Sequence, residues 1–328
     1  MYCVEQLDYL DWQKHIKSCK KSNILQFWQY GNAKSNTSNW NAYRFLILNT
    51  NHEPVAMVQV MALEFSIFGG IARINRGPIF IGSYENKGEL VKIFSAIFDE
   101  FKKRRWFFTQ IAPETNNSNQ LRIFFKNNRF KKLSKNPYAS GLISLQNEES
   151  NLLLGLKKKW RYSLRRAQKS ELNITMLEPS SSNLNTLIKQ YNQLKSTKEF
   201  QGISSPLVMS LANQKATPEW KFNIFIANKE KSTNIEDCCG ILVSVLHGDT
   251  STYLIGITDK DGRVLQANYL LLWESIMNAK KNGCSWFDIG GLDSSTPSGI
   301  SHFKNGLKSE KYSLDGEYRG FIFPWRNY

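Results

Sequence analysis

Two side chains in the second half of the chain, Asp288 and Lys304, have surroundings that suit acid–base or electrostatic chemistry. Asp288 ends a short apolar run and precedes Gly290-Gly291, and glycines permit a tight turn and the close approach of a ligand. Such an aspartate either acts as a general base or caps the turn, and both roles stay open. Lys304 lies between Phe303 and Asn305-Gly306, and from spacing alone an isolated lysine is ordinarily a surface residue.

Residues 157–169 form the densest cluster of positive charge in the chain. The segment contains seven Lys or Arg residues and no acid. Its pattern predicts a helix over residues 152–169, with an apolar face and a basic face. The basic face is either simply solvated or binds phosphates, because cations with no acidic partner on the same helix repel one another until an anion approaches. The residues concerned are Lys157, Lys158, Lys159, Arg161, Arg165, Arg166 and Lys169.

Several enzyme classes have no motif support. The four histidines do not form H-E-x-x-H, and G-x-S-x-G, the P-loop pattern and G-x-G-x-x-G are all absent. The five cysteines include no C-x-x-C pair, which favours free thiols in a reducing cytoplasm over a disulfide framework or a structural zinc site. We therefore expect neither a metal nor a covalent cofactor.

Composition points to a folded protein with anionic partners. The chain has 328 residues, 41% of them hydrophobic, and a formal charge of +15, which attracts RNA, nucleotide phosphates or an anionic membrane. The longest apolar stretch, residues 55–68, is interrupted by polar side chains, so a transmembrane helix is not expected. The first thirty residues lack the apolar core of a signal peptide, and we expect a cytoplasmic protein.

The elements that position these residues follow from periodicity. The pattern predicts a β-hairpin in the region 41–81, a helix over 89–103, a strand over 104–111, a short helix over 118–127 and a strand over 139–145. After a polar stretch at 146–150, a comparable series begins. It comprises the basic helix, a helix over 183–194, a helix over 266–282, and strands over 173–177, 221–227, 239–247, 252–258 and 285–289. This order favours two mixed α/β domains of similar construction.

Several short motifs, in this order along the chain, resemble the FemABX family of aminoacyl-tRNA-dependent peptidyltransferases. The first is Leu25-Gln26 followed by an aromatic residue, Gly31 and Lys34, and the second is Arg76-Gly77-Pro78. The basic helix ending in Ala167-Gln168-Lys169 comes next. The remaining motifs are the helix over 266–282, Phe287-Asp288-Ile289-Gly290-Gly291, and Gly299-Ile300 followed by Phe303-Lys304-x-Gly306.

The resemblance implies an architecture and an activity. The fold would be two GNAT-like domains packed together, with α/β mixed sheets, over residues 1–146 and 147–315. Residues 316–328 would form a C-terminal segment that returns to the first domain. The activity would be transfer of an aminoacyl group from aminoacyl-tRNA to an amine of a peptidoglycan precursor, in cell-wall biogenesis.

The resemblance also assigns roles to individual residues. Lys304 would stabilise the charge on the attacked carbonyl and Asp288 would be the second catalytic candidate. Lys34 would contact the diphosphate of the precursor. The other substrate-binding residues would be Trp28, Arg76, Phe303, Gly290 and Gly291, and Lys158, Arg161, Arg165 and Lys169 would bind tRNA phosphates. Aminoacyl-tRNA and a muropeptide would be the partners, with peripheral contact to an anionic membrane at its inner face and without a cofactor.

Two departures from the family pattern leave alternatives open. Members that bind a UDP-linked precursor carry an Arg and a Tyr four residues later, and both are missing from the segment 198–209. A GNAT-type acyltransferase that uses a CoA or carrier thioester on an amino sugar or another cell-surface precursor is the second candidate. However, residues 263–268, where a CoA-binding loop would lead into the helix, lack its glycines.

Overall fold

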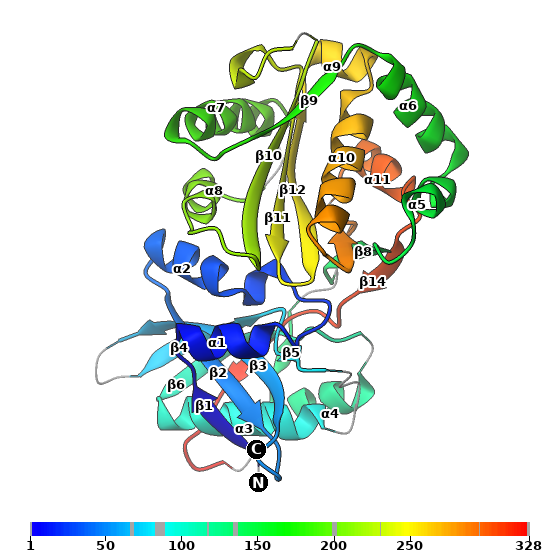
Figure 1. Cartoon of the computed structure of the whole chain (residues 1–328). Coiled ribbons are helices and arrows are strands. Elements are labelled where there is room, and N and C mark those ends of the chain that lie inside the picture. Colours follow the sequence, from blue (N-terminus) through cyan, green and yellow to red (C-terminus); the bar gives the residue numbers. More distant parts are fainter. Residues whose placement is uncertain are drawn as a thin grey trace. The chain divides into compact units, whose positions relative to one another are not determined.

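The computed structural model describes residues 2–65, 69–82, 89–116, 118–133, 137–198, 202–229, 231–294 and 296–326. The chain divides into two compact units (Figure 1). Unit 1 comprises residues 1–139 and 312–328, and unit 2 comprises residues 140–311. Each unit contains a mixed β-sheet with helices packed on it, which confirms the predicted mixed α/β fold class.

The sheet of unit 1 has the strand order β1-β2-β3-β4-β6-β15-β7, with β5 paired to β3. The predicted hairpin is confirmed as the antiparallel pair β2 and β3, whereas β4 and β6 run parallel. The last strand comes from the end of the chain and pairs with β6 and β7. The strands are β1 (Cys3–Gln6), β2 (Asn41–Leu48), β3 (Pro54–Glu64), β4 (Gly70–Asn75), β5 (Ile79–Phe80), β6 (Trp106–Ala112), β7 (Lys131–Lys132) and β15 (Tyr318–Phe321).

Helices cover both faces of this sheet. α3 (Leu90–Lys103) and α4 (Asn119–Asn127) pack an aromatic core against one face of the sheet. Because side chains alternate along a strand, Arg44 and Gln59 point to the opposite face, which η1 (Ile24–Gln26) and α2 (Trp28–Asn36) cover. α1 (Tyr9–Ile16) lies beside α2 and contacts it through aromatic rings.

The sheet of unit 2 has the order β14-β8-β13-β12-β11-β10-β9. β9 to β12 form an antiparallel meander, β13 joins β12 in parallel, and β8 pairs with β13. The strands are β8 (Ala139–Ser144), β9 (Asn173–Leu177), β10 (Trp220–Asn228), β11 (Gly240–His247), β12 (Thr250–Thr258), β13 (Trp286–Asp288) and β14 (Glu310–Ser313).

Helices again lie on both faces of the sheet of unit 2, as Figure 1 shows. α6 (Lys158–Lys169) and α10 (Ala267–Lys281) share one apolar core with the strands. α7 (Ser181–Lys198) and α8 (Ser205–Ala212) lie on the other face. Short helices α5 (Glu149–Gly155), α9 (Lys260–Val264) and α11 (Ser298–Asn305), with η3 (Ile235–Asp237), complete the unit.

Two details differ from the sequence-based expectations. The single helix predicted over 152–169 is broken into α5 and α6, because Leu156 and Lys157 adopt extended backbone and the Lys157 N–H donates to the Gly306 carbonyl instead of continuing a helix. The boundary predicted after residue 146 lies at 139/140 in the compact units, because β8 hydrogen-bonds to β13 in the second sheet. The second boundary lies at 311/312 rather than after residue 315.

No helix among the described residues combines the length and the apolar character that crossing a membrane requires.

Candidate functional site

The Phe303-Lys304-Asn305-Gly306 segment ends α11 and packs against α6. The Phe303 ring stacks on Trp160 of α6 at 5.9 Å between centroids, and Tyr269 of α10 contacts both rings at 5.0 Å. A Cβ at Gly306 would lie 2.3 Å from the Trp160 ring, so glycine is required for this contact. The motif therefore fixes α11 against the basic helix, and Phe303 contributes to packing.

Lys304 turns its side chain in the opposite direction, into the interior of unit 2. Only 6% of the residue is exposed, and its Nζ donates to the Gly291 carbonyl at 3.1 Å. The ammonium also lies 5.1 Å from the centre of the Tyr253 ring. Among the described residues, no carboxylate forms an ion pair with it. Burial lowers the pKa of Lys304 to about 8, and the charges of Asp288 and Asp293 oppose this only in part.

The turn after β13 places backbone directly beside this ammonium. Gly290 has a φ of +71°, and a Cβ there would lie 2.9 Å from the Tyr253 carbonyl oxygen and 3.3 Å from Lys304 Nζ. β13 pairs with β12 only through residues 250–252, and its chain then leaves the sheet while β12 continues. Gly290 is thus the residue that lets the chain pass close to Tyr253 and Lys304, and Gly291 supplies the carbonyl that accepts from Lys304.

Asp288 supports this turn. It is 3% exposed, and its Oδ1 accepts hydrogen bonds from the Gly290 N–H at 2.8 Å and from the Ser140 hydroxyl. This geometry is that of a turn cap, which is one of the two roles that the sequence left open for Asp288; the other is that of a general base. Asp288 also contributes favourable charge to Lys304.

Tyr253 was not among the residues singled out from the sequence. It lies in the apolar alternation of β12, where a tyrosine resembles any other strand residue. Burial raises the pKa of its phenol to about 12, so the group stays neutral near pH 7. Its ring face is available to the Lys304 cation, an attraction that the sequence could not reveal.

The basic helix α6 presents its cations to solvent. Trp160, Leu164 and Ala167 face the core, whereas Lys158, Arg165 and Lys169 are exposed. Arg161 is partly buried and donates to the Leu154 carbonyl of α5 at 2.6 Å. The apolar face of this helix therefore anchors α11, and its basic face is open to an anion.

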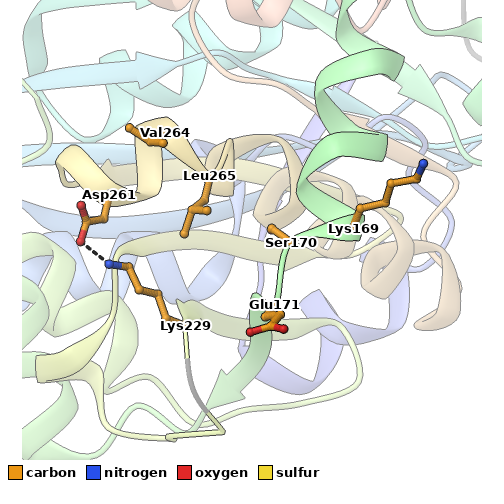
Figure 2. A pocket seen from close by; sticks show the side chains of 7 residues that line it. All are labelled: Lys169, Ser170, Glu171, Lys229, Asp261, Val264 and Leu265. Atoms are coloured by element: carbon orange, nitrogen blue, oxygen red, sulfur yellow. Dashed lines mark hydrogen bonds and ion pairs between the residues drawn. The ribbon is translucent and has the colours of Figure 1, made fainter.

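A pocket of about 450 Å³ lies at the C-terminal end of α6 (Figure 2). Lys229 pairs with Asp261 there, and Lys169 points away from this pair. With both signs of charge around it, the pocket does not favour phosphate over other ligands. The cations available to a phosphate are therefore those on the exposed basic face of α6, not those that line this pocket. The lining residues are Lys169, Ser170, Glu171, Lys229, Asp261, Val264 and Leu265.

In unit 1, α2 carries Lys34 and Trp28. Lys34 lies in the last turn and is partly buried, and no side-chain partner of its ammonium occurs among the described residues. The Trp28 ring stacks on the buried guanidinium of Arg44 at 3.9 Å. Arg44 hydrogen-bonds to Gln59, to Asn32 and to backbone carbonyls, and burial lowers its pKa to about 9. The position of Arg44 in an apolar strand was the only sequence signal for it.

Arg76 has a different environment from that expected of a ligand-binding residue. Its guanidinium makes two hydrogen bonds to Glu114, at 2.7 and 2.8 Å, and a third to the Tyr312 hydroxyl at 2.9 Å. It also stacks on Tyr138 at 4.7 Å. Burial alone would lower the pKa of Arg76, but the Glu114 carboxylate raises it well above the usual value. Internal partners thus engage the side chain.

The helix that would receive a CoA pyrophosphate is α10. It begins after Gln266, which has a φ of +61° and donates its side-chain amide to the Arg263 carbonyl. The preceding residues form α9 rather than a glycine-rich loop. In the part of the chain that the structure describes, no group of three or more His, Cys, Asp or Glu side chains could hold a metal ion. Of the segment 198–209, residues 199–201 lie outside the described residues.

Comparison with known proteins gives a family match over part of the chain and a similar fold over nearly all of it. Residues 181–325 match the model of the FemAB family. The crystal structure of FemX superimposes on this chain with a TM-score of 0.76 at 15% identity, covering 97% of each chain. A tandem GNAT protein from the clavulanic acid biosynthesis pathway has a TM-score of 0.55 at 6% identity, covering 99% of this chain and 100% of that protein. L-PGS from Bacillus licheniformis has a TM-score of 0.54 at 10% identity, covering 98% and 94%.

No curated protein sequence matches this chain significantly. The structural likenesses confirm the GNAT-like fold that was expected in both halves of the chain. Residues 181–325 therefore resemble the FemAB family and the whole chain has a FemX-like fold, and these likenesses together support a transferase.

Proposed function

We propose that the protein transfers an aminoacyl group from an aminoacyl-tRNA to an amine of a peptidoglycan precursor. The observation that carries the proposal is the buried Lys304 ammonium, held beside the Gly290-Gly291 turn without a carboxylate partner among the described residues. The FemAB family match supports the reaction class. A buried cation that lacks a neutralising acid is costly, and an anion that forms during the reaction would offset that cost.

In the proposed reaction the acceptor amine attacks the carbonyl carbon of the aminoacyl ester. A C–N bond forms, the ester C–O bond breaks, and the ribose hydroxyl of the tRNA leaves with the proton that the amine loses. Lys304 would stabilise the oxyanion by on the order of 3 kcal/mol. The aminoacyl ester is already activated, so positioning of the two substrates can supply much of the remaining rate.

The donor RNA is proposed to lie on α6. Lys158, Arg165 and Lys169 are exposed on that helix, and Arg161 lies among them. The opposite face of α6 contacts Phe303, the residue before Lys304. RNA bound along the basic face would therefore be held on the element that also fixes the position of α11.

The acceptor is proposed to contact α2 of unit 1. Lys34, in the last turn of this helix, would serve as a point charge for phosphate, and Trp28 at the start of the same helix would be a further contact. The missing Arg and Tyr in the segment 198–209 weaken the case for a UDP-linked precursor, so we propose a phosphorylated muropeptide without specifying its carrier.

Transfer of a radiolabelled amino acid from charged tRNA to UDP-linked and to lipid-linked muropeptides tests the proposal. We expect label in the muropeptide fraction, lost after treatment of the tRNA with RNase before the reaction. Transfer that survives RNase, or labelling of neither muropeptide across a panel of charged tRNAs, would overturn it.

A GNAT-type acyltransferase that uses CoA remains the second candidate because a tandem GNAT protein shares the fold. The start of α10 argues against it, since the glycines that cradle a pyrophosphate are absent and α9 occupies the preceding residues. Calorimetric titration separates the two. Saturable binding of acetyl-CoA would favour the second candidate, and no heat at millimolar CoA would count against it.

A further inference from the structure

One edge of unit 1 exposes several large aromatic side chains together. Phe65 is 51% exposed, Phe321 is 55% exposed and Trp325 is 80% exposed. The Phe321 ring contacts Phe108 at 5.1 Å and Phe323 at 6.3 Å, and Phe323 contacts Trp325 at 5.2 Å. Single exposed aromatics are ordinary, but a row of rings in mutual contact marks an interaction surface, and here the exposed Phe321 and Trp325 both contact the partly buried Phe323.

The outward direction of Phe321 is set by β15. Tyr318 and Gly320 on this strand face the core, whereas Arg319 and Phe321 face solvent. Phe321 pairs with Phe108 across the antiparallel ladder, so two aromatic side chains stand side by side on the same face of the sheet. Neither Phe108 nor Phe321 belongs to the hydrophobic core that unit 1 buries on the opposite face of the sheet.

A basic segment lies next to the aromatic row. The sequence Lys102-Lys103-Arg104-Arg105 links α3 to β6, immediately before Trp106-Phe107-Phe108. Lys102 donates to the Arg326 carbonyl at 2.9 Å, and the Ile322 N–H donates to the Phe107 carbonyl at 2.7 Å. These bonds join the segment 321–326 to the basic segment, more than 200 residues away in the sequence.

Two of these cations point outward and two are used internally. Lys102 pairs with Asp99, and Arg104 pairs with Glu100 and stacks on internal aromatic rings. Lys103 and Arg105 are exposed, and the Lys103 contact with Glu100 at 3.4 Å is long. The Arg105 carbonyl accepts from the Gly70 N–H at 2.9 Å, next to the hairpin that carries Phe65. The surface thus combines exposed cations with exposed aromatics.

We propose that this basic–aromatic edge, formed by Phe65, Lys103, Arg105, Phe321 and Trp325, docks on the surface of an anionic lipid bilayer. Tryptophan and phenylalanine partition to the headgroup region, and Lys or Arg beside them are attracted to anionic lipids. Both signals together are needed for stable peripheral binding, and both are present here. The proposal does not depend on the transfer reaction proposed above.

The arrangement of the rings favours a bilayer over single-stranded RNA. Phe108, Phe321, Phe323 and Trp325 already pack on one another at 5.1 to 6.3 Å. A platform for RNA instead presents separate ring faces on which successive bases stack. The exposed cations of this edge complement an anionic surface, and so does the overall charge of +15.

Vesicle sedimentation tests the proposal. We expect the protein to bind vesicles that contain phosphatidylglycerol, to bind pure phosphatidylcholine vesicles much more weakly, and to dissociate as salt is raised. Two double variants, Phe321→Ala with Trp325→Ala and Lys103→Glu with Arg105→Glu, should each weaken binding by at least about tenfold. The altered side chains are exposed, so an unchanged melting temperature should accompany the loss.

Matched controls use other exposed side chains of unit 1. Leu10→Ala removes an apolar side chain that is 76% exposed, and Lys14→Glu with Lys20→Glu changes the charge by the same amount as the basic double variant. Both controls should bind vesicles like the unaltered protein. If the edge variants and the control variants lose vesicle binding equally, the binding depends on net charge or general hydrophobicity and not on this edge. That result would overturn the proposal.

A second readout locates the contact. Lipids brominated near the headgroup should quench part of the tryptophan fluorescence, and Trp325→Phe should remove most of that quenching while binding persists. Quenching that is unchanged in Trp325→Phe would place the contact elsewhere and refute the assignment. Edge variants that lose tRNA binding but keep vesicle binding would assign the surface to RNA and likewise overturn the proposal.

Discussion

Arg76 in unit 1 and Lys304 in unit 2 are both buried cations, exposed by 8% and 6%, yet their surroundings are opposite. Glu114 neutralises Arg76 through two hydrogen bonds and raises its pKa. Among the described residues, the Lys304 ammonium contacts the Gly291 carbonyl and the Tyr253 ring, and burial lowers its pKa to about 8. Arg76 is thus satisfied by its own unit, whereas Lys304 retains an unneutralised charge.

The difference shows how to separate a structural cation from a candidate catalytic one. A buried ion pair leaves little charge for a ligand, and its loss is felt in stability. A buried cation without an acid lowers stability and is retained where a developing negative charge needs it. Arg44 resembles Lys304 in having no carboxylate partner among the described residues, but its hydrogen bonds to Gln59, Asn32 and backbone carbonyls make it a support for α2 and Trp28.

The largest expected effect is on stability, at Arg76. Arg76→Met leaves the Glu114 carboxylate partly buried without its cation, and should lower the unfolding free energy by about 3 to 5 kcal/mol. Urea denaturation measures this. Adding Glu114→Gln to Arg76→Met should recover part of the loss, and a single variant as stable as the unaltered protein would mean that the pair is not structural.

Lys304→Met should produce the reverse pattern. We expect transfer to fall by about a hundredfold to a thousandfold, because the oxyanion loses its cation. The unfolding free energy should be unchanged or higher, by as much as about 3 kcal/mol, since the desolvation penalty of the ammonium disappears. Single-turnover transfer and urea denaturation on the same preparation test both halves. A variant that is destabilised but transfers normally would mean that Lys304, like Arg76, has a structural role.

Charge reversal on α6 examines cations on the basic face of that helix, where Arg165 is exposed and Arg161 is partly buried. Arg161→Glu with Arg165→Glu should weaken tRNA binding by about tenfold or more and flatten its dependence on salt, because fewer counterions are released. Lys189→Glu with Lys215→Glu, also exposed in unit 2, is the control with the same change of charge. An unchanged salt slope would show that the basic face is only solvated.

The pH dependence gives the smallest effect. Because the pKa of Lys304 is about 8, the part of the rate that depends on its charge should decline about fivefold between pH 8 and pH 9. The unfolding free energy should instead rise with pH between about 8 and 10.5. Below about 8 the lysine is charged in both the folded and unfolded protein, and between 8 and its ordinary value of 10.5 mainly the unfolded protein holds the proton. Lys304→Arg should shift the decline in rate to higher pH, and a decline at the same pH would assign it to another group.

Much of the fold could be predicted from periodicity. The hairpin β2–β3, helix α3, the central strands of unit 2 and helix α10 lie within a few residues of their predicted bounds, because each has a long and regular apolar pattern. α1, α2, α8 and α11 were not predicted. They are eight or nine residues long and carry few apolar residues in register, or, as in α8, lie in a short stretch without a clear period.

The candidate functional residues likewise divide into those that the sequence could predict and those that it could not. Gly290 and Gly306 could be singled out because glycine tolerates a turn or a close contact that other residues do not, and Lys304 because the motif around it resembles a family pattern. Tyr253 in unit 2, and Arg44 and Glu114 in unit 1, could not be singled out, since each has its role only through contacts with residues distant in the sequence.

The amino-acid sequence by itself determined the mixed α/β class, the excess positive charge, the basic character of α6 and the order of the motifs, because these depend on residue type and local spacing. Only the tertiary structure decided that Arg76 is neutralised and Lys304 is not, and that residues 321–326 join the basic segment before β6. Desolvation and Coulomb energy depend on neighbours in space, and the fold, not the order of residues, brings those neighbours together.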